Sequence, residues 1–375
     1  MIYLDHNAST PIRPEVRAAM EPFLAGGYGN PSSIHGPGRQ AREAVEAARE
    51  QIAALLGATS KEICFTSGGT EADNWALRDR NGVVTSTVEH PAVLRSAEAR
   101  RDAGARVLLV GVDGEGRVDP EAVLAAVASS ETTDLVSLIL ANNETGTLQP
   151  LEQIGPLLQE RGILFHSDAV QAFGKVPVDV DTLGVDLMSL SAHKLNGPKG
   201  VGALYVRQGT DLAPWTRGGG HEHGLRAGTE NVASIVGFGA AAALRVSEMV
   251  DDAVRLSAWR DRLEDRLSTA IGDVVVNGSR VQRLPGTLNV SFQRIEAESV
   301  LLGLDLEDVA VASGSACTEG ATEPSHVLLA MGLEPRLASG AVRFSLGYGN
   351  DADQMDRVVD LLQPIVARLR ELSTF

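Results

Sequence analysis

Short apolar segments alternate with helical segments between residues 62 and 206, and this alternation restricts the possible folds more than any other feature of the chain. The predicted strands are residues 62–66, 83–87, 106–110, 135–140, 163–167, 186–191 and 202–206. Helical stretches, such as 119–128 and 151–161, separate most of them. Strands that alternate with helices favour a mainly parallel sheet with both faces covered, so we predict an α/β fold.

The pattern changes after about Gly220, which indicates a second structural unit. The segments that follow are a long helix, two short strands and a closing helix, at residues 231–267, 274–278, 287–292 and 352–371. A length of 375 residues suits one large domain or two modest ones. We predict a large domain over residues 15–250 and a smaller α+β domain formed by residues 1–14 and 251–375.

Composition and charge exclude several classes of protein. The net charge is 33 − 49 = −16, and an acidic surface repels phosphate backbones, so we expect no direct binding of nucleic acid. We see no apolar run near the roughly 20 residues that span a bilayer and no signal peptide. Two cysteines, Cys64 and Cys317, cannot form a disulfide framework or a four-cysteine metal site. We therefore expect no membrane association and a cytoplasmic location.

Polar residues gather directly after the predicted strands. The five clusters are Ser67–Thr70, Glu89–His90, Asn142–Glu144, Asp168–Gln171 and Ser191–Lys194. In an open α/β sheet, ligands bind beyond the carboxyl ends of the strands. The five clusters should therefore converge on one site at one edge of the sheet.

Three of these clusters together predict a pyridoxal-phosphate site. The glycine turn at Ser67–Thr70 opens a helix whose N-terminus suits a phosphate, although such turns are often purely structural. Asp168 either caps the next helix or faces a protonated heterocyclic nitrogen. Lys194 is either a solvated surface group or, at a strand end, a desolvated amine that forms Schiff bases. The pattern of pyridoxal-phosphate sites combines a lysine that forms a Schiff base with an aspartate at the ring nitrogen. The glycine turn, Asp168 and Lys194 together match it.

The cysteines and a pair of histidines call for separate interpretations. Cys317 lies in a segment rich in Gly, Ser, Ala and Thr (312–322), where an accessible thiol is suited to reaction. Cys64 lies within an apolar strand and is expected to be an inert core residue. His221 and His223 resemble a metal-ligand pair, but their i, i+2 spacing is not that of a zinc-binding helix, and we predict no metal site.

The chain resembles the class V, fold-type I pyridoxal-phosphate enzymes, and among them the NifS/IscS-type cysteine desulfurases. The matching stretches follow the family's order along nearly the whole chain. They are YLDHNASTP (3–11), YGNPSSIHGPGR (28–39), FTSGGTEADN (65–74), VEHPAVL (88–94), NNETG (142–146), HSDAVQAFGK (166–175), SAHKLNGPKGVGALYV (191–206), RGGG (217–220), LRAGTENV (225–232), GSACTEGATEPSHVLLAMG (314–332) and VRFSLG (342–347).

The resemblance implies a role for each matching residue. Lys194 would form the Schiff base with pyridoxal 5'-phosphate, His90 would stack on the pyridine ring and transfer protons, and Asp168 would contact the ring nitrogen. Cys317 would be the nucleophile. The remaining implied contacts are Gln171 with the ring oxygen; Gly69, Thr70, Ser191 and His193 with the phosphate; Thr229 with the phosphate of the neighbouring subunit; Asn143 with cofactor and substrate; and Asn7 and Arg343 with the substrate carboxylate.

The implied reaction removes sulfur from L-cysteine, which leaves L-alanine and a persulfide on Cys317. The sulfur then passes to an acceptor protein, such as an iron–sulfur scaffold or a tRNA-thiolation enzyme, and the enzyme is expected to be a homodimer. The alternatives are a selenocysteine lyase or another class V aminotransferase-type reaction, and a scaffold that has lost catalysis. Cys317 favours the desulfurase, because an aminotransferase has no use for this thiol, and the four reactive residues together argue against the scaffold.

Overall fold

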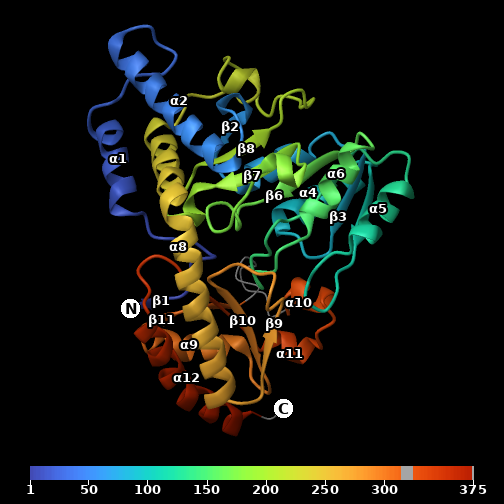
Figure 1. The fold of residues 1–375 in the computed structure, drawn as a ribbon, viewed down its shortest axis with the longest axis vertical. Coiled ribbons are helices and arrows are strands. Elements are labelled where there is room, and N and C mark those ends of the chain that lie inside the picture. Colours follow the sequence, from blue (N-terminus) through green and yellow to red (C-terminus); the bar gives the residue numbers. More distant parts are fainter. Residues whose placement is uncertain (314–323, 374–375) are drawn as a thin grey trace.

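The computed structural model describes residues 1–313 and 324–373, so the predicted nucleophile Cys317 lies outside the described residues. Its centre is a seven-stranded sheet with the order β2-β8-β7-β6-β5-β3-β4 (Figure 1). The strands are β2 (Ile63–Thr66), β3 (Gly82–Ser86), β4 (Arg106–Val110), β5 (Leu135–Ser137), β6 (Leu164–Asp168), β7 (Leu187–Ser191) and β8 (Gly202–Val206). Six of these seven strands run in one direction and β8 alone runs opposite to them, which confirms the mainly parallel α/β sheet.

Helices cover both faces of this sheet, as the alternating strands and helices predict. The helices of the region are α1 (Pro14–Ala25), α2 (Gly36–Leu56), α3 (Gly69–Leu77), α4 (Pro91–Asp102), α5 (Pro120–Ala128), α6 (Leu151–Gln159), α7 (Val180–Leu183) and α8 (Val232–Ala270). Side chains of α3 and α4 form one apolar cluster with Cys64 and Leu187, whereas those of α2, α5, α6 and α8 form another with Phe65 and Met188. Neighbouring residues of one strand thus enter opposite cores, as the pleat requires.

The helix α2 shows how local sequence sets an element. The imidazole of His35 accepts a hydrogen bond from the backbone N–H of Gly38, which caps the first turn, and Gly57 ends the helix in the left-handed conformation at φ 70°. Val45 and Ile52 lie on the buried face between these two ends. Local sequence therefore sets both ends of this helix and its buried face.

One predicted strand is shorter than expected. The segment 135–140 continues as extended chain past Ser137, and the N–H groups of Leu138 and Leu140 still bond to carbonyls of β6. The N–H of Ile139 instead donates to the carboxylate of Glu89, 3.0 Å away. A side chain thus takes the place of a strand partner at the point where the site begins.

The C-terminal third forms a second sheet with the order β12-β13-β10-β9, all antiparallel. Its elements and those around it are β9 (Val274–Asn277), β10 (Thr287–Phe292), α9 (Ala297–Asp305), β11 (Val309–Ala310), β12 (Ala312–Ser313), α10 (His326–Ala330), α11 (Pro335–Ser339), β13 (Ala341–Ser345) and α12 (Ala352–Leu372). The N-terminal strand β1 (Ile2–Tyr3) pairs with β11, and Leu4 joins the core of this second unit. The N-terminus therefore packs with the C-terminal third (Figure 1).

The 39-residue helix α8 passes from one core to the other. Phe238 lies in the core beside the large sheet, and Leu263 lies in the core beside the small one. Of the described helices, only α8 has the length and mean hydropathy (1.3) of a membrane span, and 44% of its most apolar window is buried inside the protein. The division into residues 15–250 and residues 1–14 with 251–375 stays a prediction.

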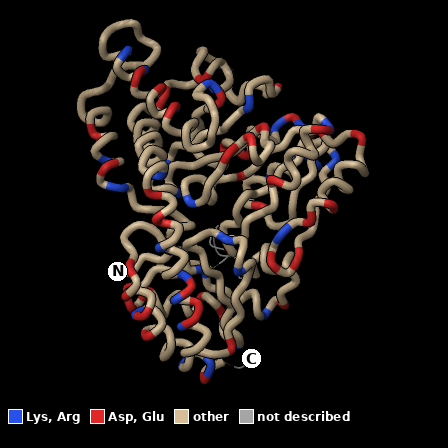
Figure 2. Tube along the Cα trace, viewed as in Figure 1, with Lys and Arg blue, Asp and Glu red and all other residues tan. Residues whose placement is uncertain are grey.

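Charged residues occur along the outer helices, with acidic and basic residues intermixed (Figure 2). On the small sheet's side, Arg262 and Arg266 of α8 form ion pairs with Asp356 and Asp360 of α12. These pairs join the end of α8 to the closing helix. They are partly exposed, so each contributes little to stability by itself.

Candidate active site

The carboxyl ends of β2, β3, β5, β6 and β7 lie at one edge of the large sheet, because these five strands run in the same direction. Each of the five predicted polar clusters begins at the end of one of these strands or a few residues after it: Asp168 and Ser191 are the last residues of β6 and β7, and Asn142 follows the end of β5 by five residues. The expected convergence at one edge is therefore confirmed. Residues of the N-terminal segment and of β13 complete the site from the other core.

Lys194 lies at the end of a short 3-10 turn, Ala192–Lys194, that directly follows β7. Its amino group donates to the backbone carbonyl oxygens of Asn7, at 2.6 Å, and Ala8, at 2.9 Å. The side chain is held at the strand end, half-buried, and faces the N-terminal segment. An amine held in this way is suited to Schiff-base chemistry.

Asp168 is the last residue of β6, and His90 directly precedes the first residue of α4. Their side chains lie next to each other. Oxygen and ring nitrogen atoms of Asp73, His90 and Asp168 all lie within 4.8 Å of one another. Burial raises the pKa of Asp168, which is opposed by the attraction of His90. Burial lowers the pKa of His90, and Nδ1 accepts a hydrogen bond from the N–H of Ala92 at 3.1 Å, so the neutral ring carries its proton on Nε2.

Asp73 is a third ionisable group at this place, and the sequence did not single it out. Burial raises its pKa well above the usual value, and repulsion from Asp168 and Glu89 adds to the shift. Because buried like charges cannot all ionise, we assign the proton to Asp73 and the negative charge to Asp168. The spacing of Asp73, His90 and Asp168 would also admit a metal ion, and the absence of a metal stays a prediction.

Three of the residues predicted to hold a phosphate, Gly69, Thr70 and Ser191, lie at the N-terminus of α3. Gly69 and Thr70 form its first turn, whose N–H groups have no partner within a helix. A Cβ atom on Gly69 would lie 2.6 Å from Val170 Cγ2 and 3.8 Å from Ser191 Cβ, so only glycine leaves this space open. Glu71, in the first turn of α3, accepts a hydrogen bond from the N–H of Ser67 at 2.8 Å and so caps this end of the helix.

His193 lies in the turn after Ser191, between β7 and Lys194. Burial and the neighbouring lysines Lys194, Lys199 and Lys175 lower its pKa to about 4. Its Nδ1 lies 3.3 Å from the hydroxyl of Ser9. A neutral imidazole at this position can donate one hydrogen bond to an anion.

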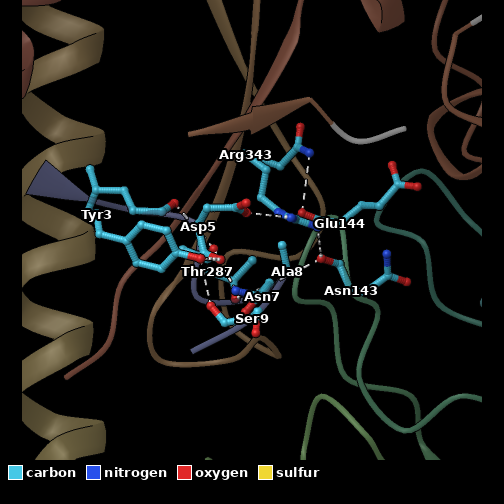
Figure 3. Close-up of polar contacts among 12 residues, drawn as sticks. Tyr3, Asp5, Asn7, Ala8, Ser9, Asn143, Glu144, Thr287 and Arg343 are labelled. Carbon is cyan, nitrogen blue, oxygen red and sulfur yellow. Dashed lines mark hydrogen bonds and ion pairs between the residues drawn. The ribbon is translucent and has the colours of Figure 1, made fainter. Parts of the chain in front are cut away.

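Asn7, Asn143 and Arg343 meet at a single point, although they come from three distant parts of the chain (Figure 3). Arg343 donates to the carbonyl of Asn143 at 3.0 Å and to the carboxylate of Asp5 at 2.8 Å. The amide of Asn7 donates to the same carbonyl at 3.2 Å and to Thr287 Oγ1 at 3.0 Å. The buried Nε of Arg343 has no hydrogen-bond partner among the described residues, which leaves a donor for a carboxylate.

Gln171 also contacts this group, and the contact includes a residue that the sequence did not single out. Its Nε2 donates to the carbonyl of Asn7 at 2.8 Å, and its Oε1 accepts from Lys175 at 2.8 Å. Lys175 also donates to the side-chain oxygen of Asn7 at 3.1 Å. Lys175 follows Gln171 by four residues in the same matching stretch and is one of four lysines in the chain, which were the available signals.

Two buried glutamates build the loops of the site. Burial raises the pKa of Glu89 to about 8 and that of Glu144 to about 7. Glu89 accepts from the hydroxyl of Ser86, and Glu144 accepts from the hydroxyl of Ser325. Glu144 thus joins the loop after β5 to Ser325, and Nε2 of the neighbouring His326 lies 3.1 Å from the backbone carbonyl of Glu89.

Other candidate residues lie away from this group. Thr229 is exposed on the surface of the single chain, so its role at a neighbouring subunit stays a prediction. Glu222, between the two histidines, is buried and binds Arg49 at 2.6 Å and the N–H of Phe65 at 2.8 Å. Burial raises the pKa of Cys64 to about 12, which confirms an inert core thiol.

The geometry fits pyridoxal 5'-phosphate. Three features lie along the same edge of the large sheet. They are the turn at Gly69, the buried carboxylate of Asp168 beside the neutral imidazole of His90, and Lys194. Each corresponds to a different part of the cofactor: the phosphate, the ring and the aldehyde. The free donor of Arg343 fits the carboxylate of an amino-acid substrate.

Comparison with known proteins gives consistent matches over the whole chain. Residues 2–358 match the model of the aminotransferase class V family. The chain is 46% identical to the cysteine desulfurase IscS of Dictyoglomus turgidum, over 100% of this chain and 96% of that protein. A solved NIFS-like protein has a TM-score of 0.91 at 36% identity, over 98% of this chain and 100% of that one. The structure of SspA in complex with cysteine has a TM-score of 0.82 at 36% identity, over 92% and 99%.

Proposed function

This chain belongs to the class V aminotransferase family, and from that membership we propose how it acts as a pyridoxal-phosphate-dependent cysteine desulfurase. The observation that carries the proposal is that Lys194, Asp168 and His90 lie together at the carboxyl edge of one sheet. The matched relatives extend over the full chain, so the whole activity is expected here. The proposed product of the first half-reaction is L-alanine, with the sulfur on Cys317.

When bound, the cofactor supplies an electron sink that weakens the bonds at the α-carbon of the substrate. The carboxylate of Asp168 would hold a protonated ring nitrogen, which its burial beside neutral Asp73 permits. Arg343 and Asn143 would orient the carboxylate of L-cysteine. Lys194 would carry the proton from the α-carbon, and His90, with its proton on Nε2, would be placed to donate one.

The sulfur transfer itself belongs to Cys317. Its thiolate would attack the sulfur of the substrate, so that a sulfur–sulfur bond forms as the carbon–sulfur bond breaks. The electron pair of the broken bond remains with the substrate carbon, which is then protonated and released as alanine. A thiolate is required because the thiol is a poor nucleophile.

The wider role is also a proposal. We infer that the persulfide sulfur passes to a separate acceptor protein, such as an iron–sulfur scaffold or a tRNA-thiolation enzyme, in the cytoplasm. We also infer a homodimer, supported by the exposed position of Thr229, a residue expected to serve the neighbouring subunit's phosphate. A symmetric pair of chains would then build two complete sites.

The direct test is mass spectrometry of the purified protein after brief exposure to L-cysteine. The proposal expects one added sulfur atom on the peptide that contains Cys317 and an equal amount of alanine. Sulfur found only on Cys64, or alanine formed at the wild-type rate by Cys317→Ser, would contradict the proposed nucleophile. A selenocysteine lyase would instead turn over selenocysteine and leave L-cysteine unreacted, which the same assay detects.

The assignment of Lys194 is tested separately. Lys194→Ala, stripped of endogenous amines, should lose the borohydride-reducible link to the cofactor. Lys199→Ala is the matched control, since Lys199 is an exposed lysine of the same segment, and it should keep the link at Lys194. A link that persists in Lys194→Ala would move the role to another lysine.

A further inference from the structure

Two of the four lysines in this chain lie at the same site. Lys175 and Lys194 line one pocket together with Asn7 and Thr287. Burial of its amino group, followed by repulsion from Lys194, Arg343 and Arg245, lowers the pKa of Lys175 to about 7. Arginine supplies the other 29 basic residues, so a lysine at this place is a specific choice.

The backbone directs Lys175 toward the site. Gly174 has a φ of 73°, in the left-handed region, and a Cβ atom there would lie 2.9 Å from Arg245 Cγ. The N–H of Lys175 bonds back to the carbonyl of Ala172. This tight turn returns the lysine to Gln171, four residues earlier, and to Asn7.

The contacts of Lys175 decide which way two amides point. In its protonated form the amino group of Lys175 only donates hydrogen bonds, and it donates to the side-chain oxygens of Gln171 and Asn7, at 2.8 and 3.1 Å. The nitrogen of Gln171 then points to the backbone carbonyl of Asn7, and the nitrogen of Asn7 points to Asn143 and Thr287. The backbone carbonyl of Asn7 only accepts, so Lys175 and this carbonyl hold the Gln171 amide in one orientation from both ends.

We propose that Lys175 is a positioning residue that holds Gln171 as a hydrogen-bond donor toward the ring oxygen of the bound cofactor. The inference rests on the proposed function and deepens it. Gln171 Nε2 carries two hydrogens, and among the described residues one of them is used, on the carbonyl of Asn7. The second is directed by the same orientation and is available to an anionic oxygen, which only a donor can stabilise.

The charged groups around Lys175 favour the same arrangement. Lys194 from the turn after β7, Arg343 from β13 and Arg245 from α8 all raise the positive potential at this point, and His6 is kept neutral there, with its pKa lowered to about 4 mainly by burial and partly by Lys175. Arg245 is itself paired with Asp252 at 2.7 Å. The positive field thus favours bound anions, while Lys175 and the backbone carbonyl of Asn7 together hold the orientation of Gln171.

The test compares Lys175→Met, which keeps the length of the side chain without its donors, with Lys175→Arg, which keeps donors and charge. Lys61→Met is the matched control at an exposed lysine. The visible absorption of the cofactor-loaded protein is titrated with pH, and kcat and KM are measured beside it. Lys175→Met should shift the midpoint of the titration by roughly one pH unit and lower kcat roughly tenfold, as expected for the loss of one hydrogen bond to a charged group.

A double variant separates this role from a general effect of charge. Because Lys175 acts through Gln171, Lys175→Met should add no further shift in a Gln171→Ala background. Lys175→Arg should bring the midpoint of the pH titration at least partly back to its wild-type value. An unchanged midpoint in Lys175→Met, or shifts that add fully in the double variant, would overturn the inference. A wild type that binds no cofactor would overturn the proposed function, whereas an active wild type with an unaffected Lys175→Met overturns this inference alone.

Discussion

The amino group of Lys194 lies 2.6 Å from the backbone carbonyl oxygen of Asn7, although 187 residues separate the two in the sequence. The contact exists because β1 pairs with β11, which holds the N-terminal segment in the second core and brings its next residues across to the large sheet. The reactive lysine therefore contacts a segment that belongs to the other core. The active site is formed where the two cores meet.

Asp168→Asn should leave a folded protein that binds cofactor but turns over slowly, by roughly tenfold or more, because a neutral partner no longer favours a protonated ring nitrogen. The matched control is Asp73→Asn, an identical chemical change within 4.8 Å. Asp73 is assigned as protonated, so an amide should replace it with an effect of about threefold or less. Steady-state alanine formation compares the two, and equal losses would contradict the assignment of charge.

Glu89→Gln should make stability less dependent on pH. Burial raises the pKa of Glu89 from 4.5 to about 8, so between these values the folded protein keeps a proton that the unfolded chain has released. Wild-type stability should thus fall as pH rises through this window, by up to about 1.4 kcal/mol per pH unit for this proton. Urea unfolding of the cofactor-free wild type and of cofactor-free Glu89→Gln at pH 5 and pH 8 measures how the free energy of unfolding of each depends on pH. An equal change between the two pH values in both proteins would refute the prediction.

Glu222→Gln should destabilise the fold by roughly 3 kcal/mol, because it leaves the buried guanidinium of Arg49 without its charged partner. His223→Asn is the control beside it. His223 is exposed with a φ of 59°, a conformation that asparagine tolerates, so the change should stay within about 0.5 kcal/mol. The denaturant midpoints of Glu222→Gln and His223→Asn measure the loss of stability in each variant. Equal stability of the two variants would mean that the ion pair contributes nothing.

Cys317→Ser should retain binding of L-cysteine and lose alanine formation, because serine cannot hold a persulfide. The variant leaves Cys64 as the one thiol in the chain, and this thiol is buried with its pKa raised to about 12. Iodoacetamide should therefore fail to label native Cys317→Ser at pH 8 and label it after unfolding. Rapid labelling of the native variant would show that Cys64 is reactive and reopen the choice of nucleophile.

Much of the site could be read from short stretches of sequence. The period of the apolar residues predicted the strands and helices, since that period is a local property of each segment. The positions of His90, Asp168 and Lys194 directly after strands predicted one common edge, because parallel strands end on the same side. The order of the matching stretches added the cofactor and the reaction.

Local pattern could not show which groups would meet across the fold. The antiparallel direction of β8, the contact of Asn7 with Lys194 and the approach of Asp73 to Asp168 depend on how distant segments reverse and pack. Lys175 is the clearest case: its place in a matching stretch marked it, but only the turn at Gly174 places its amino group between two amide oxygens. The sequence thus determined which chemistry was possible, whereas the tertiary structure decided the protonation and orientation of the groups, because both depend on burial and on neighbours far away in the chain.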